Sequence, residues 1–93
     1  MMKAAEEGHL EIVRMLVESR ANMEETNKKG RTALSFAAAP SRKRPTAVET
    51  LRYLLQAGAS NDVTDINGRT PREQATREKR TDAIVVFDEF ERM

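Results

Sequence analysis

The sequence predicts an all-α protein made of stacked repeats, and three observations support this fold class. The hexapeptide Asn-Lys-Lys-Gly-Arg-Thr at 27–32 recurs 38 residues later as Asp-Ile-Asn-Gly-Arg-Thr at 65–70. A second segment, 11–17, recurs at 49–55, again after 38 residues, and at 82–87 after a further 33. Within these segments the apolar side chains fall at helical spacing. A fixed period of this length indicates helical units that bury their apolar faces by stacking.

Each copy of the hexapeptide has the composition of a turn that leads into a helix. It begins with an Asx side chain that can close the turn, followed by a glycine that tolerates a positive φ. The final threonine, Thr32 or Thr70, is suited to cap the helix that follows. We therefore expect each copy of the hexapeptide to form a turn that is followed by a helix.

Two helix starts also carry the spacing of a capping box. Thr46 precedes Glu49 by three residues, and Thr70 precedes Glu73 by three, with Pro71 at the first helical position. Small residues recur at matching positions in the three units, where they allow neighbouring helices to approach closely. These residues are Ala4, Ala5, Ala37, Ala38 and Ala75. Each unit is thus expected to run as turn, helix, short turn, helix and loop.

Length and composition limit the class of protein. The chain has 93 residues, enough for one small domain, and it is 33% charged without an apolar run that could cross a bilayer. Its start does not resemble a signal peptide. It contains no cysteine, which excludes disulfides and thiolate metal sites and fits an intracellular location, cytoplasmic or nuclear.

Three segments together resemble the ankyrin repeat: 30–34 (Gly-Arg-Thr-Ala-Leu), 4–13 (Ala-Ala-Glu-Glu-Gly-His-Leu-Glu-Ile-Val) and 57–59 (Ala-Gly-Ala). The resemblance covers essentially the whole chain. It implies a solenoid of stacked antiparallel helix pairs with β-turn fingers, used for protein binding rather than catalysis. On this basis 1–93 is a single domain, with an incomplete first repeat at 1–26, a complete repeat at 27–64 and a C-terminal capping repeat at 65–93.

Departures from the family pattern carry further expectations. The first unit begins at its alanine pair, so we expect its turn and much of its first helix to be lacking. Either the chain is a fragment or this edge is an unusual cap. Arg20 stands where the next unit has Gly58, at a helix end that often needs a left-handed residue. The middle repeat carries an insertion at 39–45 that holds two prolines and three cations. It should form a basic loop, because prolines prevent a helix from running through it.

Catalytic chemistry finds no support in the residue pattern. His9 is the only histidine and has no second ligand or nucleophile at a useful spacing. The paired carboxylates are adjacent in sequence, so on a helix they point apart. The glycines lack the spacing and the lysine of a phosphate loop. We expect no enzymatic activity, no cofactor and no metal site.

Charge is distributed unevenly along the repeat and points to a partner. Cations gather in the turns, the first helices and the insertion, which are the elements that the family directs toward its concave face, whereas acids lie mostly elsewhere. Such a surface would steer an acidic protein or peptide toward it. The alternative is that these cations only keep the protein soluble.

The candidate partner-binding residues occupy the variable positions of the family motif, together with the cations of the insertion. They are Glu6, Glu7, Lys28, Lys29, Arg31, Arg42, Lys43, Arg44, Ile66, Asn67, Arg69, Arg77 and Glu78.

Two other functions remain open. Self-association would follow if the short first unit leaves Ile12, Met15 and Leu16 uncovered. Arg42, Lys43 and Arg44 could also serve as a nuclear-import signal or contact nucleic acid. An aromatic content of 4% disfavours nucleic-acid binding, because few rings are present for base stacking.

Overall fold

The computed structural model describes residues 1–39 and 45–91, and over these ranges it contains six α-helices and no strand. The predicted all-α fold is confirmed. The helices are α1 (Met2–Glu6), α2 (Leu10–Glu18), α3 (Ala33–Ala38), α4 (Pro45–Gln56), α5 (Pro71–Arg77) and α6 (Thr81–Glu91). The expectation of a basic loop at Arg42, Lys43 and Arg44 lies outside the described residues.

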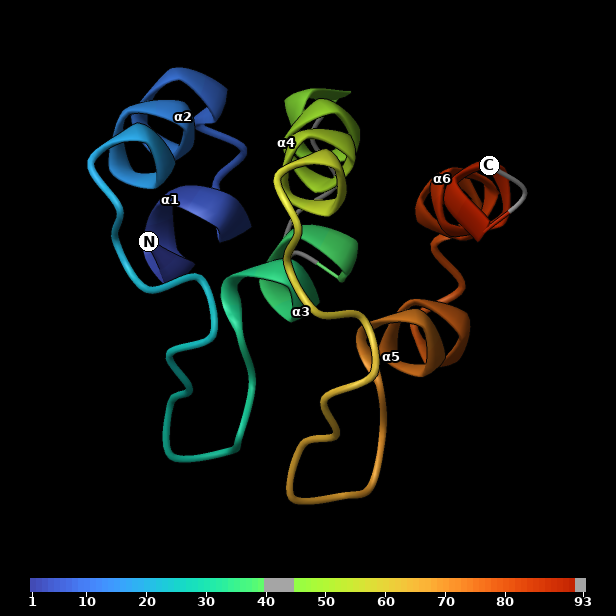
Figure 1. Cartoon of the computed structure of the whole chain (residues 1–93). Helices are drawn as coiled ribbons and strands as arrows, with labels where there is room; N and C mark the ends of the chain where they lie inside the picture. Colours follow the sequence, from blue (N-terminus) through green and yellow to red (C-terminus); the bar gives the residue numbers. More distant parts are fainter. Residues whose placement is uncertain (40–44, 92–93) are drawn as a thin grey trace.

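The six helices form three pairs that stack side by side into a short solenoid (Figure 1). The first helices of the pairs, α1, α3 and α5, lie in one row, and the second helices, α2, α4 and α6, lie in a parallel row. The turns that precede α3 and α5 project from the same side as two fingers. Helix α1 spans five residues, α3 spans six and α5 spans seven. That the first repeat is incomplete stays a prediction.

Both fingers are closed by the Asx side chain that begins them, as predicted. The Oδ1 atoms of Asn27 and Asp65 each accept hydrogen bonds from the amides two and four residues later, at 2.8–3.0 Å. Gly30 and Gly68 have φ angles of 73° and 75°, which a side chain would strain. The two fingers therefore have the same local structure for the same local reason.

The predicted N-terminal caps are confirmed at the starts of α3 and α5. Thr70 Oγ1 accepts from the Glu73 amide at 3.2 Å and Glu73 Oε1 accepts from the Thr70 amide at 3.0 Å, which completes the capping box before α5. At the start of α3, Thr32 Oγ1 accepts from the Ser35 amide at 3.4 Å. Each bond satisfies an amide that has no partner within its helix.

The capping box predicted at Thr46 was wrong. Helix α4 already begins at Pro45, so Thr46 is a helical residue whose carbonyl accepts from Thr50 Oγ1 at 2.9 Å. Proline favours this earlier start because its fixed φ suits the first helical position and it has no amide to leave unpaired.

Helices α2, α4 and α5 end with the same left-handed motif. Residues Arg20, Gly58 and Lys79 have φ angles of 65°, 98° and 57°. In each case that amide donates to the carbonyl three residues back and the next amide donates to the carbonyl five residues back, which is a Schellman motif. The expectation for Arg20 is confirmed, and Lys79 is a second non-glycine residue in this conformation.

The core lies between the two rows of helices. Its largest fully buried side chains include Leu34, Leu51, Leu54, Leu55 and Phe87. The small residues at the contacts of α1, α3 and α5 are also buried, and Ala5, Ala38 and Ala75 have no exposed surface. Alanine at these positions lets the short helices approach closely, so each repeat covers the next.

Candidate protein-interaction surface

The tips of the two fingers form one continuous surface. Lys28 and Lys29 lie on the first tip, Ile66 and Asn67 lie on the second, and all four are exposed. The Ile66 amide donates a hydrogen bond of 3.0 Å to the Lys29 carbonyl, which holds the tips together. The side chain of Ile66 is 70% exposed, a large value for an apolar residue. We refer to these four residues as the finger-tip surface.

Behind the finger-tip surface, an ion pair joins the second repeat to the third. Arg31 Nε lies 3.6 Å from Asp65 Oδ2, and the Asp65 side chain is only 3% exposed. Burial of this carboxyl acts to raise its pKa. The amide hydrogen bonds of Arg69 and Asn67 and the charge of Arg31 outweigh burial, so the pKa of Asp65 lies below its ordinary value. Arg31 is therefore occupied by a contact between repeats.

Glu7, an acidic candidate of the first repeat, makes its contacts within that repeat. Glu7 forms an ion pair with Lys3 at 3.3 Å and a hydrogen bond with His9 Nε2 at 3.0 Å. Hydrogen bonds from Lys3 and then His9 hold the pKa of Glu7 below its ordinary value. Glu6 is half-buried at the last position of α1. His9, the chain's only histidine, is thus hydrogen-bonded to Glu7 in the turn before α2.

Arg77 and Glu78 are exposed at the opposite end of α5 from the finger. At a rise of 1.5 Å per residue, Arg77 lies about 9 Å along the helix from Pro71. Of the predicted residues, the structure therefore brings Lys28, Lys29, Ile66 and Asn67 together, with Arg31 and Arg69 behind them. It leaves Glu6, Glu7, Arg77 and Glu78 elsewhere.

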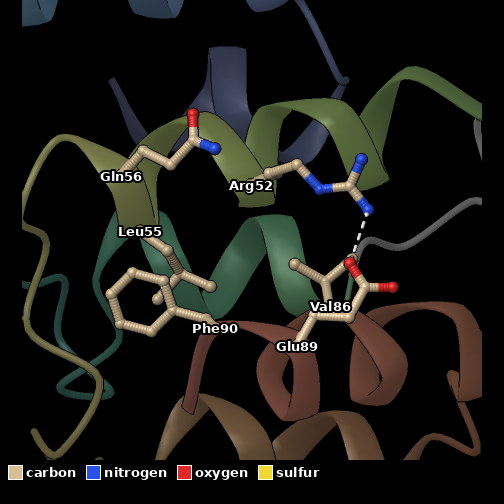
Figure 2. Close-up of a pocket in the computed structure, with 6 residues that line it drawn as sticks. All are labelled: Arg52, Leu55, Gln56, Val86, Glu89 and Phe90. Atoms are coloured by element: carbon tan, nitrogen blue, oxygen red, sulfur yellow. Dashed lines mark hydrogen bonds and ion pairs between the residues drawn. The ribbon is translucent and has the colours of Figure 1, made fainter. Parts of the chain in front are cut away.

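A shallow groove of about 100 Å³ between α4 and α6 was not predicted from the sequence (Figure 2). Leu55, Val86 and Phe90 form its apolar wall, and an ion pair of 3.4 Å between Arg52 and Glu89 closes one side. The spacing of Val86 and Phe90 on α6 was the only local signal for it. The groove has room for one aliphatic side chain, and its lining offers no arranged nucleophile.

Within residues 1–39 and 45–91, no group of three or more histidine or acidic side chains is placed to hold a metal ion. In the same ranges no helix is long and apolar enough to span a membrane. Tyr53 is half-buried, with the Arg14 guanidinium 5.5 Å from the centre of its ring. The chain's other aromatic side chains, Phe36, Phe87 and Phe90, are buried or half-buried.

Comparisons with known proteins identify the repeat. A family model described as ankyrin repeats, in three copies, matches residues 1–87. Over 95% of this chain the structure resembles the crystal structure of EF0377, an ankyrin repeat protein, with a TM-score of 0.86 and 27% identity. Over 94% it resembles an ankyrin repeat domain from Acinetobacter baumannii, with a TM-score of 0.83 and 30% identity.

The chain spans 45% and 44% of the lengths of these two structures. A search of curated protein sequences found no match. Repeats of this kind generally serve as protein-interaction modules and are generally non-catalytic. Since the family match extends over nearly the whole sequence, the chain belongs to the ankyrin-repeat family.

Proposed function

We propose that this chain is a non-catalytic module that binds an acidic protein or peptide through the finger-tip surface and the adjoining concave face. One observation carries the proposal: two exposed lysines lie on the same surface as Ile66, an apolar residue that is 70% exposed. Within the part of the chain that the structure describes, neither Lys28 nor Lys29 has an ion-pair partner. Their charge is therefore available to a carboxylate of the partner.

The two kinds of side chain on the finger-tip surface favour different steps of binding. Lysine ammonium groups act at long range and raise the association rate with an acidic partner. Ile66 contributes binding free energy once water is excluded from the contact. This contribution slows dissociation of the complex. The partner that fits this surface is an acidic segment that also presents an apolar side chain.

The first experiment reverses the two lysines together, as Lys28→Glu with Lys29→Glu. The matched control is Arg20→Glu with Lys79→Glu, which changes the net charge equally at exposed positions in loops. A partner captured from cell extract with the parent protein should associate more slowly with the finger variant, and the control should resemble the parent. The difference should shrink toward physiological salt, where the screening length is about 8 Å.

Ile66→Ser tests the apolar half of the surface. We expect faster dissociation with an unchanged salt dependence, because no charge is altered. The helical spectrum should also be unchanged, since Ile66 is exposed. Equal rates for the parent and both finger variants would contradict the proposed surface, as would a captured partner that is basic.

A phosphate polymer tests the nucleic-acid alternative in the same set of variants. We expect it to retain neither the parent nor the charge variants. Retention that is lost when Lys28 and Lys29 are reversed would instead favour nucleic-acid binding. Location in the cytoplasm or nucleus is a separate prediction, which microscopy of the tagged protein would test.

A further inference from the structure

The groove between α4 and α6 has a counterpart between α2 and α4, because the chain repeats. Equivalent positions of α2 and α4 are 38 residues apart, and those of α4 and α6 are 33 residues apart. These offsets give every residue of the groove an equivalent in the preceding pair of helices. For Arg52, Leu55, Gln56, Val86, Glu89 and Phe90 the equivalents are, in the same order, Arg14, Val17, Glu18, Tyr53, Gln56 and Ala57.

Between α2 and α4 this place holds an aromatic ring next to an arginine. The guanidinium carbon of Arg14 lies 5.5 Å from the centre of the Tyr53 ring. At this distance the cation is attracted to the face of the ring. Tyr53 is half-buried, so its ring is also partly removed from water. The chain itself thus shows which side chain suits this place between two second helices.

Between α4 and α6 the arginine is kept and the ring is lost. Arg52 is the equivalent of Arg14, whereas Val86 stands at the position of Tyr53. Arg52 instead pairs with Glu89 at 3.4 Å (Figure 2). The two side chains of this pair are 48% and 56% exposed. An ion pair that is exposed to this extent contributes little stability, so a ligand can displace it at small cost.

The lining of the groove suits a ring. Leu55 and Val86 are buried beneath it, and the ring of Phe90 stands on the side away from Glu89 (Figure 2). The volume of about 100 Å³ is smaller than the enclosed cavity of about 150 Å³ that binds benzene. Because the groove is shallow, a ring enters it in part and keeps one face available to the Arg52 guanidinium.

We propose that the groove between α4 and α6 binds an aromatic side chain of a partner protein, phenylalanine or tyrosine, with its ring against Arg52. The ring takes the place that Tyr53 takes beside Arg14. An aromatic side chain seated in a pocket is a common anchor of protein interfaces. The groove lies on the row of second helices and the finger-tip surface lies on the turns, so the two sites are independent (Figure 1).

Two small probes test the choice of an aromatic occupant. They are N-acetyl-tyrosine amide and, as the aliphatic control, N-acetyl-leucine amide. Titration of either probe is followed by the nuclear magnetic resonance signals of the Leu55 and Val86 methyl groups. We expect saturable shifts at millimolar concentrations of the tyrosine probe and about two- to fivefold weaker binding of the leucine probe, which makes no cation–ring contact.

Arg52→Gln removes the cation and leaves the apolar lining in place. It should weaken binding of the tyrosine probe about two- to fivefold and leave binding of the leucine probe unchanged. The matched control is Arg14→Gln, at the equivalent position of α2, which should leave binding of both probes unchanged. Since Arg52 is exposed, its replacement should also leave the helical spectrum unchanged.

Val86→Tyr supplies the missing ring from the chain itself. The variant should retain the helical spectrum, since α4 carries tyrosine at the same position, and it should lose binding of the tyrosine probe. The proposal would be overturned by shifts that do not saturate, by equal affinity for the two probes, or by unchanged binding of the tyrosine probe to Arg52→Gln. A folded Val86→Tyr variant that binds the tyrosine probe as the parent does would also overturn it.

Discussion

At the scale of single residues, Arg20 and Lys79 adopt a backbone conformation that glycine adopts without strain. Both have φ near +60°, at helix ends with the same hydrogen bonds as the end at Gly58. Arg20→Gly and Lys79→Gly should each stabilise the protein by up to about 1 kcal/mol, because glycine has no Cβ to strain. Glu18→Gly, at the last residue of α2, should give no such gain, because Glu18 does not have a positive φ. Chemical denaturation of the three variants measures these differences, and a loss at Arg20 would mean that its side chain has a stabilising partner.

Asp65 combines a turn acceptor with a charge, and Asp65→Asn separates the two roles. Asparagine already closes the equivalent finger at Asn27, so the turn should survive while the ion pair with Arg31 is lost. We expect the free energy of unfolding to fall by about 1–3 kcal/mol at neutral pH. The contribution of Asp65 is present above its unfolded pKa and is lost as the pH falls through its lowered folded pKa.

The difference between the parent and Asp65→Asn should therefore shrink as the pH falls below about 4. Denaturant titrations from neutral to acidic pH test this directly. If the difference in unfolding free energy stays constant with pH, the charge of Asp65 does not contribute to it.

At the scale of elements, the two threonines that share a capping-box pattern should respond differently to alanine. Thr70→Ala removes the cap of α5 and should cost about 0.5–2 kcal/mol. Thr46→Ala changes a residue inside α4 and should cost less, since alanine is the better helix former. Thermal melts followed by circular dichroism compare the two. Equal losses would indicate that Thr46 contributes through another contact of similar strength.

At the scale of the whole molecule, stability depends on the contacts between repeats, because no single unit can bury its own apolar face. Leu54→Ala should cost about 2–5 kcal/mol, since Leu54 is fully buried in the central repeat. Leu16 is its equivalent in the first repeat and is only half-buried. Leu16→Ala should therefore cost clearly less. Equal losses in urea titrations would contradict this difference in burial between Leu16 and Leu54.

Much of the fold was predictable because its causes are local. The Asx acceptors at Asn27 and Asp65 bond to amides at most four residues away, and the caps at Thr32 and Thr70 act three residues along the chain. A pattern of residues records such interactions directly. The repeat period then predicts that the units stack. For α4 the same local reasoning missed the effect of Pro45 on where the helix begins.

The state of the candidate surfaces depends on residues far apart in sequence. Arg31 and Asp65 are 34 positions apart, and their ion pair leaves Lys28 and Lys29, rather than Arg31, available to a partner. Leu16 and Leu54 occupy equivalent positions, yet one is half-buried and the other is fully buried. Local pattern cannot distinguish them, because burial depends on whether another helix packs against that face. The stacked arrangement supplies that helix for α4 and α6 and leaves α2 without one.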